Sequence, residues 1–225
     1  MCALINEWMH VERCLTLDNL SRLIANEFQV LRIPRFIDNT ICAKLSAGLS
    51  GQGYSDYLNA PSVGRIGMSY FETGLRDDLT EMYFANTFSN LDLLRAACHP
   101  YANPMDTLRC QLDERWPAGC NLQTLGGRKM FVGLSRCIKP GTPLLPHHDM
   151  FARHAPHAPE TTSLIAQFGV NIYVDVPAQG GELAMWMEEI SDTEFLRLRG
   201  DKYAIPLECL PPPDFAVKPE VGDLI

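Results

Sequence analysis

The stretch FGVNIYVDV, residues 168–176, decides the fold class of this chain. Apolar residues alternate with polar or small ones along it, and in an extended strand successive side chains point to opposite faces. The apolar face carries Val170, Ile172, Val174 and Val176, and the other carries Gly169, Asn171, Tyr173 and Asp175. The alternation predicts a strand with one apolar face and one polar face.

The two halves of the chain differ in their secondary-structure signals. Helical signals dominate the first half: residues 16–27 are amphipathic after Thr16, and residues 40–49 follow Asp38, another capping type. β-prone runs and turns dominate the second half. We expect one domain over residues 1–225, with a helical part at about 1–127 and a strand-rich core at about 128–225.

Several boundaries can be predicted from local signals. Gly51 should end the second helix, and residues 51–74 should form a long loop or an irregular hairpin. Residues 129–138 are β-prone, and Asp192 is a cap for a short helix over residues 193–199.

The composition restricts the class of partner. The 225-residue, 25.2 kDa chain has 19 Lys and Arg against 27 Asp and Glu, a formal net charge of −8 and an isoelectric point near 5.2. This charge disfavours nucleic acid and anionic membranes as partners. We therefore expect a small-molecule substrate, and the sequence leaves the oligomeric state open.

Three features favour a cytoplasmic protein. No apolar run approaches the roughly 20 residues that span a bilayer. Residues 1–7, MCALINE, lack the basic and apolar regions of a secretory signal. The eight cysteines, including Cys2, contain no Cys-x-x-Cys pair, which favours reduced thiols over a disulfide framework or a zinc knuckle.

His147 and Asp149 are the candidate metal ligands. Residues two apart in an extended segment project to the same side, so an imidazole and a carboxylate can converge on one metal. Two His and one carboxylate on one face of a metal leave three positions open, which is the geometry of non-haem iron(II) oxygenases. His-x-Asp alone is a weak signal, because it also arises by chance on protein surfaces.

The surrounding motifs make the signal specific. They are Arg136-(four residues)-Gly141-(five residues)-His147-x-Asp149, then YVDVPAQGGEL at residues 173–183, then PEVGDLI at residues 219–225. In this order they resemble the prolyl 4-hydroxylase-like branch of the iron(II)/2-oxoglutarate oxygenases, and in particular its free-standing natural-product tailoring enzymes. The resemblance covers residues 128–225 well and the helical part only loosely.

The resemblance implies the fold and the cosubstrates. The fold is of the α+β class, a double-stranded β-helix (jelly-roll) core with N-terminal helices packed on its major sheet. Fe(II), 2-oxoglutarate and dioxygen are implied. The third iron ligand, a His, and an Arg or Lys for 2-oxoglutarate would follow Ile225, so we expect the core to be incomplete at its C-terminal end.

The resemblance also implies that the apolar face of the strand at residues 168–176 packs on the helices and that its polar face lines the interior. It further implies roles around the metal. Asn171 and Tyr173, on the interior face of the strand, and Arg136 are candidates for binding 2-oxoglutarate, each with a purely structural role as the alternative. Met150 and Phe151 follow Asp149 and are candidates for the border of the substrate pocket, with simple packing as the alternative.

Hydroxylation of an unactivated C–H bond in a small metabolite, an amino acid derivative or a natural-product scaffold, is the function that these features favour. Related halogenases carry Gly where this chain has Asp149, so the carboxylate disfavours halogenation and leaves desaturation open. The alternatives are a non-catalytic jelly-roll that binds a ligand or a partner, and a zinc hydrolase using His147, His148 and Asp149. Adjacent residues of an extended chain point apart, which counts against the hydrolase.

Overall fold

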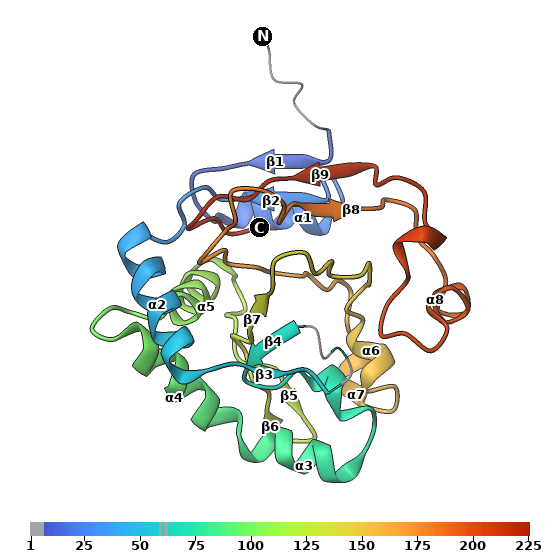
Figure 1. Cartoon of the computed structure of the whole chain (residues 1–225), viewed down its shortest axis with the longest axis horizontal. Coiled ribbons are helices and arrows are strands. Elements are labelled where there is room, and N and C mark those ends of the chain that lie inside the picture. The colour runs from blue at the N-terminus through green and yellow to red at the C-terminus, as the bar shows by residue number, and fades with distance from the viewer. Residues whose placement is uncertain (1–6, 59, 61–62) are drawn as a thin grey trace.

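The computed structural model describes residues 7–58, 60 and 63–225 of the chain, so Cys2 and the rest of residues 1–6 lie outside the described part (Figure 1). Longer helices gather in the N-terminal half and short strands occur throughout. The helices are α1 (Leu17–Ile24), α2 (Asn39–Gln52), α3 (Asp77–Ala85), α4 (Thr87–Cys98), α5 (Pro104–Arg115), α6 (Phe151–His154), α7 (Pro159–Thr162) and α8 (Asp192–Arg199), with 3-10 turns η1 (Tyr70–Thr73) and η2 (Leu207–Cys209). The strands are β1 (Met9–Val11), β2 (Val30–Arg32), β3 (Ser55–Asp56), β4 (Val63–Ile66), β5 (Thr124–Leu125), β6 (Arg128–Lys129), β7 (Ser135–Ile138), β8 (Leu183–Met185) and β9 (Phe215–Val217).

The first two helices begin where their capping residues predict. The Thr16 hydroxyl accepts a hydrogen bond from the Asn19 amide, and the Asn19 side chain accepts one from the Thr16 amide, which completes a capping box at α1. The Asp38 carboxylate accepts from the Thr40 amide at 2.7 Å and caps α2. These caps satisfy amide groups that have no partner within the helix.

Two other boundaries were predicted wrongly. α2 continues past Gly51 and ends at Gly53, whose φ of 81° suits glycine and stops the helix. α8 is capped by Ser191, whose hydroxyl accepts from the Glu194 amide, so Asp192 is the first helical residue instead of the cap. At the end of α2 two glycines lie two residues apart, and at the start of α8 two N-capping residue types are adjacent. The local sequence does not indicate which of the two marks the boundary.

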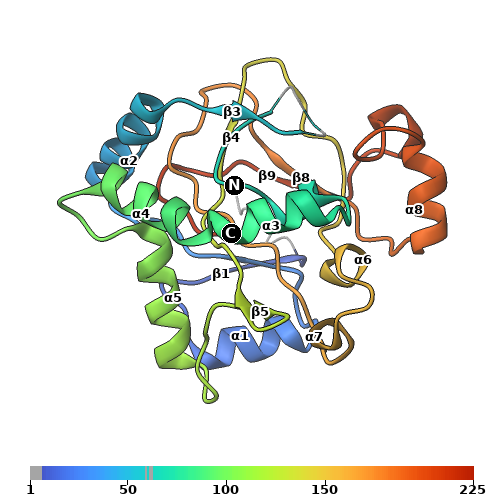
Figure 2. The ribbon, with the colours of Figure 1, turned by 90° about the horizontal axis from the view of Figure 1, so that it is seen from below.

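A layer of helices covers one side of the strands. Figures 1 and 2 show α2, α4 and α5 together on one side of the molecule and α8 on the opposite side. A Cβ atom at Gly48 of α2 would lie 2.4 Å from the carbonyl oxygen of Ala97 in α4, so the bare glycine lets these two helices approach closely. Leu45 and Leu94, from the same two helices, are buried with Ile66 of β4.

β3, β4 and β7 form an antiparallel sheet in that order. Residues 51–74 therefore contain the hairpin that was one of the two alternatives, with β3 paired to β4. In the β4–β7 register Arg65 lies opposite Arg136, so both side chains share one face of the sheet. The β-prone run at residues 129–138 is interrupted at residues 130–134, which include Gly133 with a φ of 95°.

The strand predicted at residues 168–176 does not form as a regular strand, and within this segment only Ile172 takes part in a β-bridge. Asn171 and Ile225 exchange two backbone hydrogen bonds of 2.8 and 2.9 Å, and Tyr173 bonds to residues 222 and 223. Ile172 forms a bridge with Leu224, which also bridges Ile33 of the N-terminal half. The pairing covers only the residues that lie opposite residues 222–225.

The apolar side chains at the centre of this segment pack as predicted. Ile172 packs on the buried cluster that includes Leu20 and Leu108, and Val174 packs on the cluster formed by α2 and α4. Val170, in contrast, is 48% exposed. The prediction that the apolar face packs on helices is therefore confirmed for Ile172 and Val174 and wrong for Val170, which lies before the paired residues.

The remaining strands form three two-stranded sheets, one of which is the antiparallel pair of β5 and β6. β1 runs parallel to β2, β8 pairs with β9 in antiparallel fashion, and Phe215 and Val217 of β9 are buried with Val30 of β2. Within the described residues the strands form four separate sheets, and none of them closes on itself. The double-stranded β-helix thus stays a prediction. In the same part of the chain, no helix has the length and apolarity needed to cross a membrane.

Candidate metal centre

His147 and Asp149 lie on a segment without regular secondary structure. Hydrogen bonds to residues 203 and 205 hold this segment in place. The backbone amide of Leu145 donates to the Tyr203 hydroxyl at 2.9 Å, and the amide of Ile205 donates to the Pro146 carbonyl at 3.0 Å. These bonds fix the two residues just before His147. The segment therefore presents His147 and Asp149 from a supported backbone.

The two candidate ligands face each other. Nε2 of His147 lies 3.8 Å from Oδ1 of Asp149, and 27% and 68% of their side chains are exposed, respectively. Two ligand bonds of about 2.1 Å each can join atoms up to about 4.2 Å apart, so one metal ion can contact both. The two side chains thus lie on the same side of the chain, and their role as metal ligands stays a prediction.

The tautomer of His147 suits a metal ligand. Its Nδ1 lies 2.7 Å from the carbonyl oxygen of Leu145. Because a carbonyl oxygen only accepts hydrogen bonds, Nδ1 must carry the proton in this contact. The lone pair of a neutral imidazole is then on Nε2, the atom that faces Asp149, and this arrangement is the usual one for histidines that bind metals.

Gln167 supports the Asp149 backbone, and sequence reasoning missed it. Its amide nitrogen donates to the carbonyl oxygen of Asp149, and its Oε1 accepts from the Phe151 amide at 2.9 Å. One carboxamide thus holds the chain on both sides of Met150. No sequence signal distinguishes Gln167 from any other loop glutamine, because its role depends on a contact across 18 residues of sequence.

His148 points away from the candidate metal centre. Its Nε2 lies 3.1 Å from the Arg153 guanidinium, and its ring meets the Phe195 ring of α8 edge to face, with centroids 4.5 Å apart. Burial and then the charge of Arg153 lower the pKa of His148. The Arg153 donor occupies the lone pair of Nε2, which argues against the zinc site formed with His148.

Arg136 and Asn171, both predicted to bind the cosubstrate, lie together. The guanidinium of Arg136 on β7 donates to Oδ1 of Asn171 at 2.8 Å. Arg65, opposite Arg136, is neutralised by the buried carboxylate of Glu72 at 2.7 Å. Within the described residues Arg136 forms no ion pair with a carboxylate, so its charge is available to an anionic ligand.

The charge of Arg136 acts on the hydroxyl groups of two tyrosines, Tyr57 and Tyr173. Burial raises the pKa of Tyr173, and the positive charge of Arg136 opposes the increase. Burial raises the pKa of Tyr57 to about 12, and the charges of Arg136 and Asp149 both act on the same hydroxyl. Both phenols are therefore protonated at neutral pH and can donate hydrogen bonds.

Met150 and Phe151 contact different neighbours. The Met150 sulfur lies 3.3 Å from the Arg153 guanidinium, on the side of His148, and 37% of Met150 is exposed. The Phe151 ring meets the Tyr70 ring edge to face, with centroids 6.2 Å apart. Their predicted contact with a substrate stays a prediction.

Two ligands are the extent of the candidate centre within the described residues, where no group of three or more His, Cys, Asp and Glu side chains is placed to hold a metal. No protein-family model matches the chain, and neither a curated protein nor a solved structure matches it significantly.

Proposed function

We propose that this chain is an Fe(II)/2-oxoglutarate-dependent oxygenase that hydroxylates an unactivated C–H bond of a small metabolite, an amino acid derivative or a natural-product scaffold. The observation that carries the proposal is the pair His147 and Asp149, with Nε2 and Oδ1 3.8 Å apart and the Nδ1 proton directed to the Leu145 carbonyl. This donor set of imidazole and carboxylate suits a divalent iron better than a thiolate-binding metal.

His147 and Asp149 would hold the metal, with the implied third His as their partner. Bound Fe(II), 2-oxoglutarate and dioxygen together supply the oxidising chemistry, with 2-oxoglutarate decarboxylated to succinate. The Leu145 carbonyl orients the imidazole, and Gln167 orients the backbone that carries the carboxylate. Asp149 occupies the position that is Gly in the related halogenases, which favours hydroxylation over halogenation.

Arg136 and Asn171 would hold a carboxylate of the cosubstrate. The Arg136 guanidinium has no carboxylate partner within the described residues, and Asn171 holds it at 2.8 Å. A guanidinium pairs with a carboxylate through two parallel hydrogen bonds, which fixes the orientation of the acid as well as its charge. The protonated hydroxyl of Tyr173 is a further donor on the same strand.

A cytoplasmic location belongs to the same proposal. All seven cysteines in the described part of the chain are free thiols. Free thiols are typical of proteins in a reducing compartment.

The test is anaerobic addition of Fe(II) and then 2-oxoglutarate to protein produced from its complete gene. We expect a weak visible absorption band, because an oxo acid chelated to iron(II) absorbs there. The band should be lost in His147→Ala and kept in His157→Ala, a matched change of an exposed histidine outside the centre. Folded wild-type protein without the band, or a band that survives His147→Ala, would contradict the proposal and favour the non-catalytic binding protein.

A further inference from the structure

Tyr57 lies on the same face of the β3–β4–β7 sheet as Arg136. It follows β3, and its amide donates to the carbonyl oxygen of Val63 at 3.1 Å. Val63 precedes Arg65 by two residues on β4, and Arg65 lies opposite Arg136 of β7, so these side chains share one face. The guanidinium of Arg65 lies over the Tyr57 ring, 5.6 Å from its centroid, which places Tyr57 on that face too.

Tyr57 also packs against the segment that carries the candidate ligands. It forms a buried cluster with Val63, on which Leu144 and Tyr203 pack. Both of these neighbours adjoin Leu145, whose carbonyl oxygen orients the candidate imidazole: Leu144 precedes it, and the Tyr203 hydroxyl accepts from its amide at 2.9 Å. Tyr57 is therefore in place to contact a ligand that is bound beside the candidate metal centre.

The hydroxyl of Tyr57 is available to a ligand. It makes no hydrogen bond to any residue that the structure describes. In the same part of the chain, the fully buried side-chain polar atoms without a partner are the Nε atoms of Arg109, Arg153 and Arg199, so the Tyr57 hydroxyl reaches solvent. Burial of the ring raises the pKa of this hydroxyl to about 12, so it is protonated at neutral pH and can donate a hydrogen bond.

The charges around this hydroxyl favour an anion. Arg136 acts on it most strongly, followed by Glu72 and Arg65, and Asp149 acts on it least. Glu72 and Arg65 neutralise each other at 2.7 Å. The guanidinium of Arg136 therefore provides the excess positive charge.

Asn171 completes a set of hydrogen-bond donors. Its Oδ1 accepts from the Arg136 guanidinium at 2.8 Å, and its NH₂ group makes no hydrogen bond among the described residues. The guanidinium, this NH₂ group and the Tyr57 hydroxyl can all donate. A carboxylate only accepts hydrogen bonds, so it is the ligand that fits a set of donors beside a positive charge.

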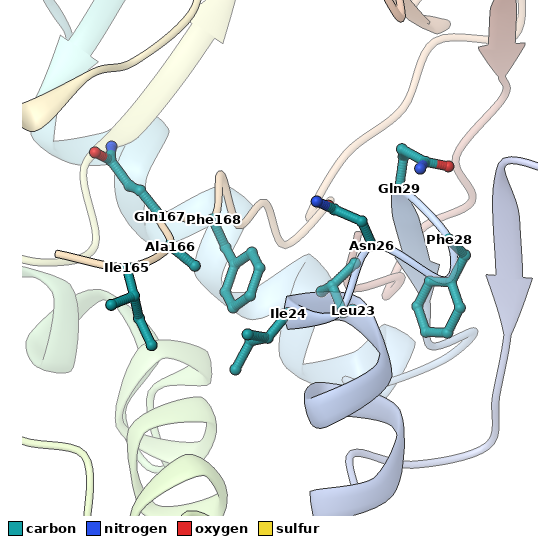
Figure 3. A pocket seen from close by; sticks show the side chains of 9 residues that line it. All are labelled: Leu23, Ile24, Asn26, Phe28, Gln29, Ile165, Ala166, Gln167 and Phe168. Atoms are coloured by element: carbon teal, nitrogen blue, oxygen red, sulfur yellow. The ribbon is translucent and has the colours of Figure 1, made fainter.

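The hollow between the C-terminal end of α1 and residues 165–168 offers no such charge (Figure 3). Its volume is about 300 Å³, and none of its lining side chains is charged. A carboxylate would lose hydration there without an opposite charge in return. An acidic ligand is therefore favoured at Arg136 over this hollow.

We propose that Tyr57 is a binding residue for the carboxylic acid held by Arg136 and Asn171, and that its hydroxyl donates a hydrogen bond to a carboxylate oxygen. An exposed guanidinium alone binds a carboxylate weakly, so the added donors determine the affinity. The inference rests on the proposed function for the identity of the acid as 2-oxoglutarate. The binding of the carboxylate itself requires no metal.

Glutarate tests the site without iron, because it has the length of 2-oxoglutarate and lacks the keto group. We expect glutarate to bind saturably to the full, metal-free chain in a calorimetric titration. Tyr57→Phe should weaken this binding about ten-fold, since a hydrogen bond to a charged group is lost. Tyr101→Phe, a matched change at a tyrosine that is 42% exposed, should keep wild-type affinity. Glutaramide, the uncharged diamide of the same length, should not bind saturably.

NMR of protein labelled with ¹³C at Cζ of tyrosine tests the contact itself. The Tyr57 signal, identified by its absence from Tyr57→Phe, should shift as glutarate binds. The proposal is overturned if folded wild-type protein does not bind glutarate, if Tyr57→Phe binds it as tightly as Tyr101→Phe does, or if glutaramide binds equally well. None of these outcomes involves iron. Glutarate binding without the iron–2-oxoglutarate band would overturn the oxygenase alone, and the band without glutarate binding would overturn the role of Tyr57 alone.

Discussion

Nδ1 of His147 bonds to the Leu145 carbonyl, and Nε2 of the same ring faces Asp149. These two contacts leave Nε2 and the Asp149 carboxylate as the atoms that can bind a metal. The position of Asp149 depends in turn on Gln167, whose side chain bonds to the backbone on both sides of Met150. Residues that orient metal ligands without touching the metal commonly affect metal affinity about 10–100-fold. At the scale of single residues, a change at Gln167 should therefore affect metal affinity, as a change at either ligand should.

Gln167→Leu should weaken Fe(II) binding about ten-fold, because the Asp149 backbone loses its attachment while both ligand side chains remain. Anaerobic Fe(II) titration measures this change. The free energy of unfolding should fall by only about 1–3 kcal/mol, the net contribution of two hydrogen bonds. Gln179→Leu, an exposed glutamine in the turn before Gly180, is the matched control and should retain wild-type affinity. Equal affinities in the two variants would show that Gln167 does not position Asp149.

At the scale of elements, the close approach of α2 and α4 is set by Gly48. A Cβ there would lie 2.4 Å from the Ala97 carbonyl oxygen, whereas a Cβ at Gly51, in the same helix, would have nothing within 4 Å. We expect Gly48→Ala to destabilise the protein by about 1–3 kcal/mol, the usual cost of overpacking. Gly51→Ala should stabilise it by about 0.5–1 kcal/mol through helix propensity. Urea unfolding of the two variants measures both effects, and changes of the same sign would contradict this account of the packing.

At the scale of the whole molecule, residues 222–225 join the two halves of the chain. Leu224 bridges Ile33 on one side and Ile172 on the other, and the fully buried carboxylate of Asp223 pairs with Arg32 of β2 at 2.6 Å. The helical half and the strand that carries Asn171 are thus connected through one short segment. The candidate cosubstrate residues depend on it for their place relative to β2.

Asp223→Ala should lower the free energy of unfolding by about 3–5 kcal/mol, because it leaves the Arg32 guanidinium, only 15% exposed, without its buried partner. Glu220→Ala removes a carboxylate that lies 3.5 Å from the same guanidinium but is 74% exposed, and should cost about 0–1 kcal/mol. Chemical unfolding followed by circular dichroism distinguishes the two. Similar losses of unfolding free energy in the two variants would mean that burial does not determine how strongly each carboxylate stabilises the fold through Arg32.

The sequence by itself determined the starts of α1 and α2, the alternation that lets Ile172 and Val174 pack on the helices, and the placement of His147 and Asp149 on one side of the chain. All of these depend on a local period or a cap, which act within a few residues. Only the tertiary structure decided that Gln167 holds Asp149, that Arg136 meets Asn171, and that residues 222–225 pair with both halves. Those contacts join residues far apart in sequence, and no local pattern records which distant partner the folded chain will bring to them.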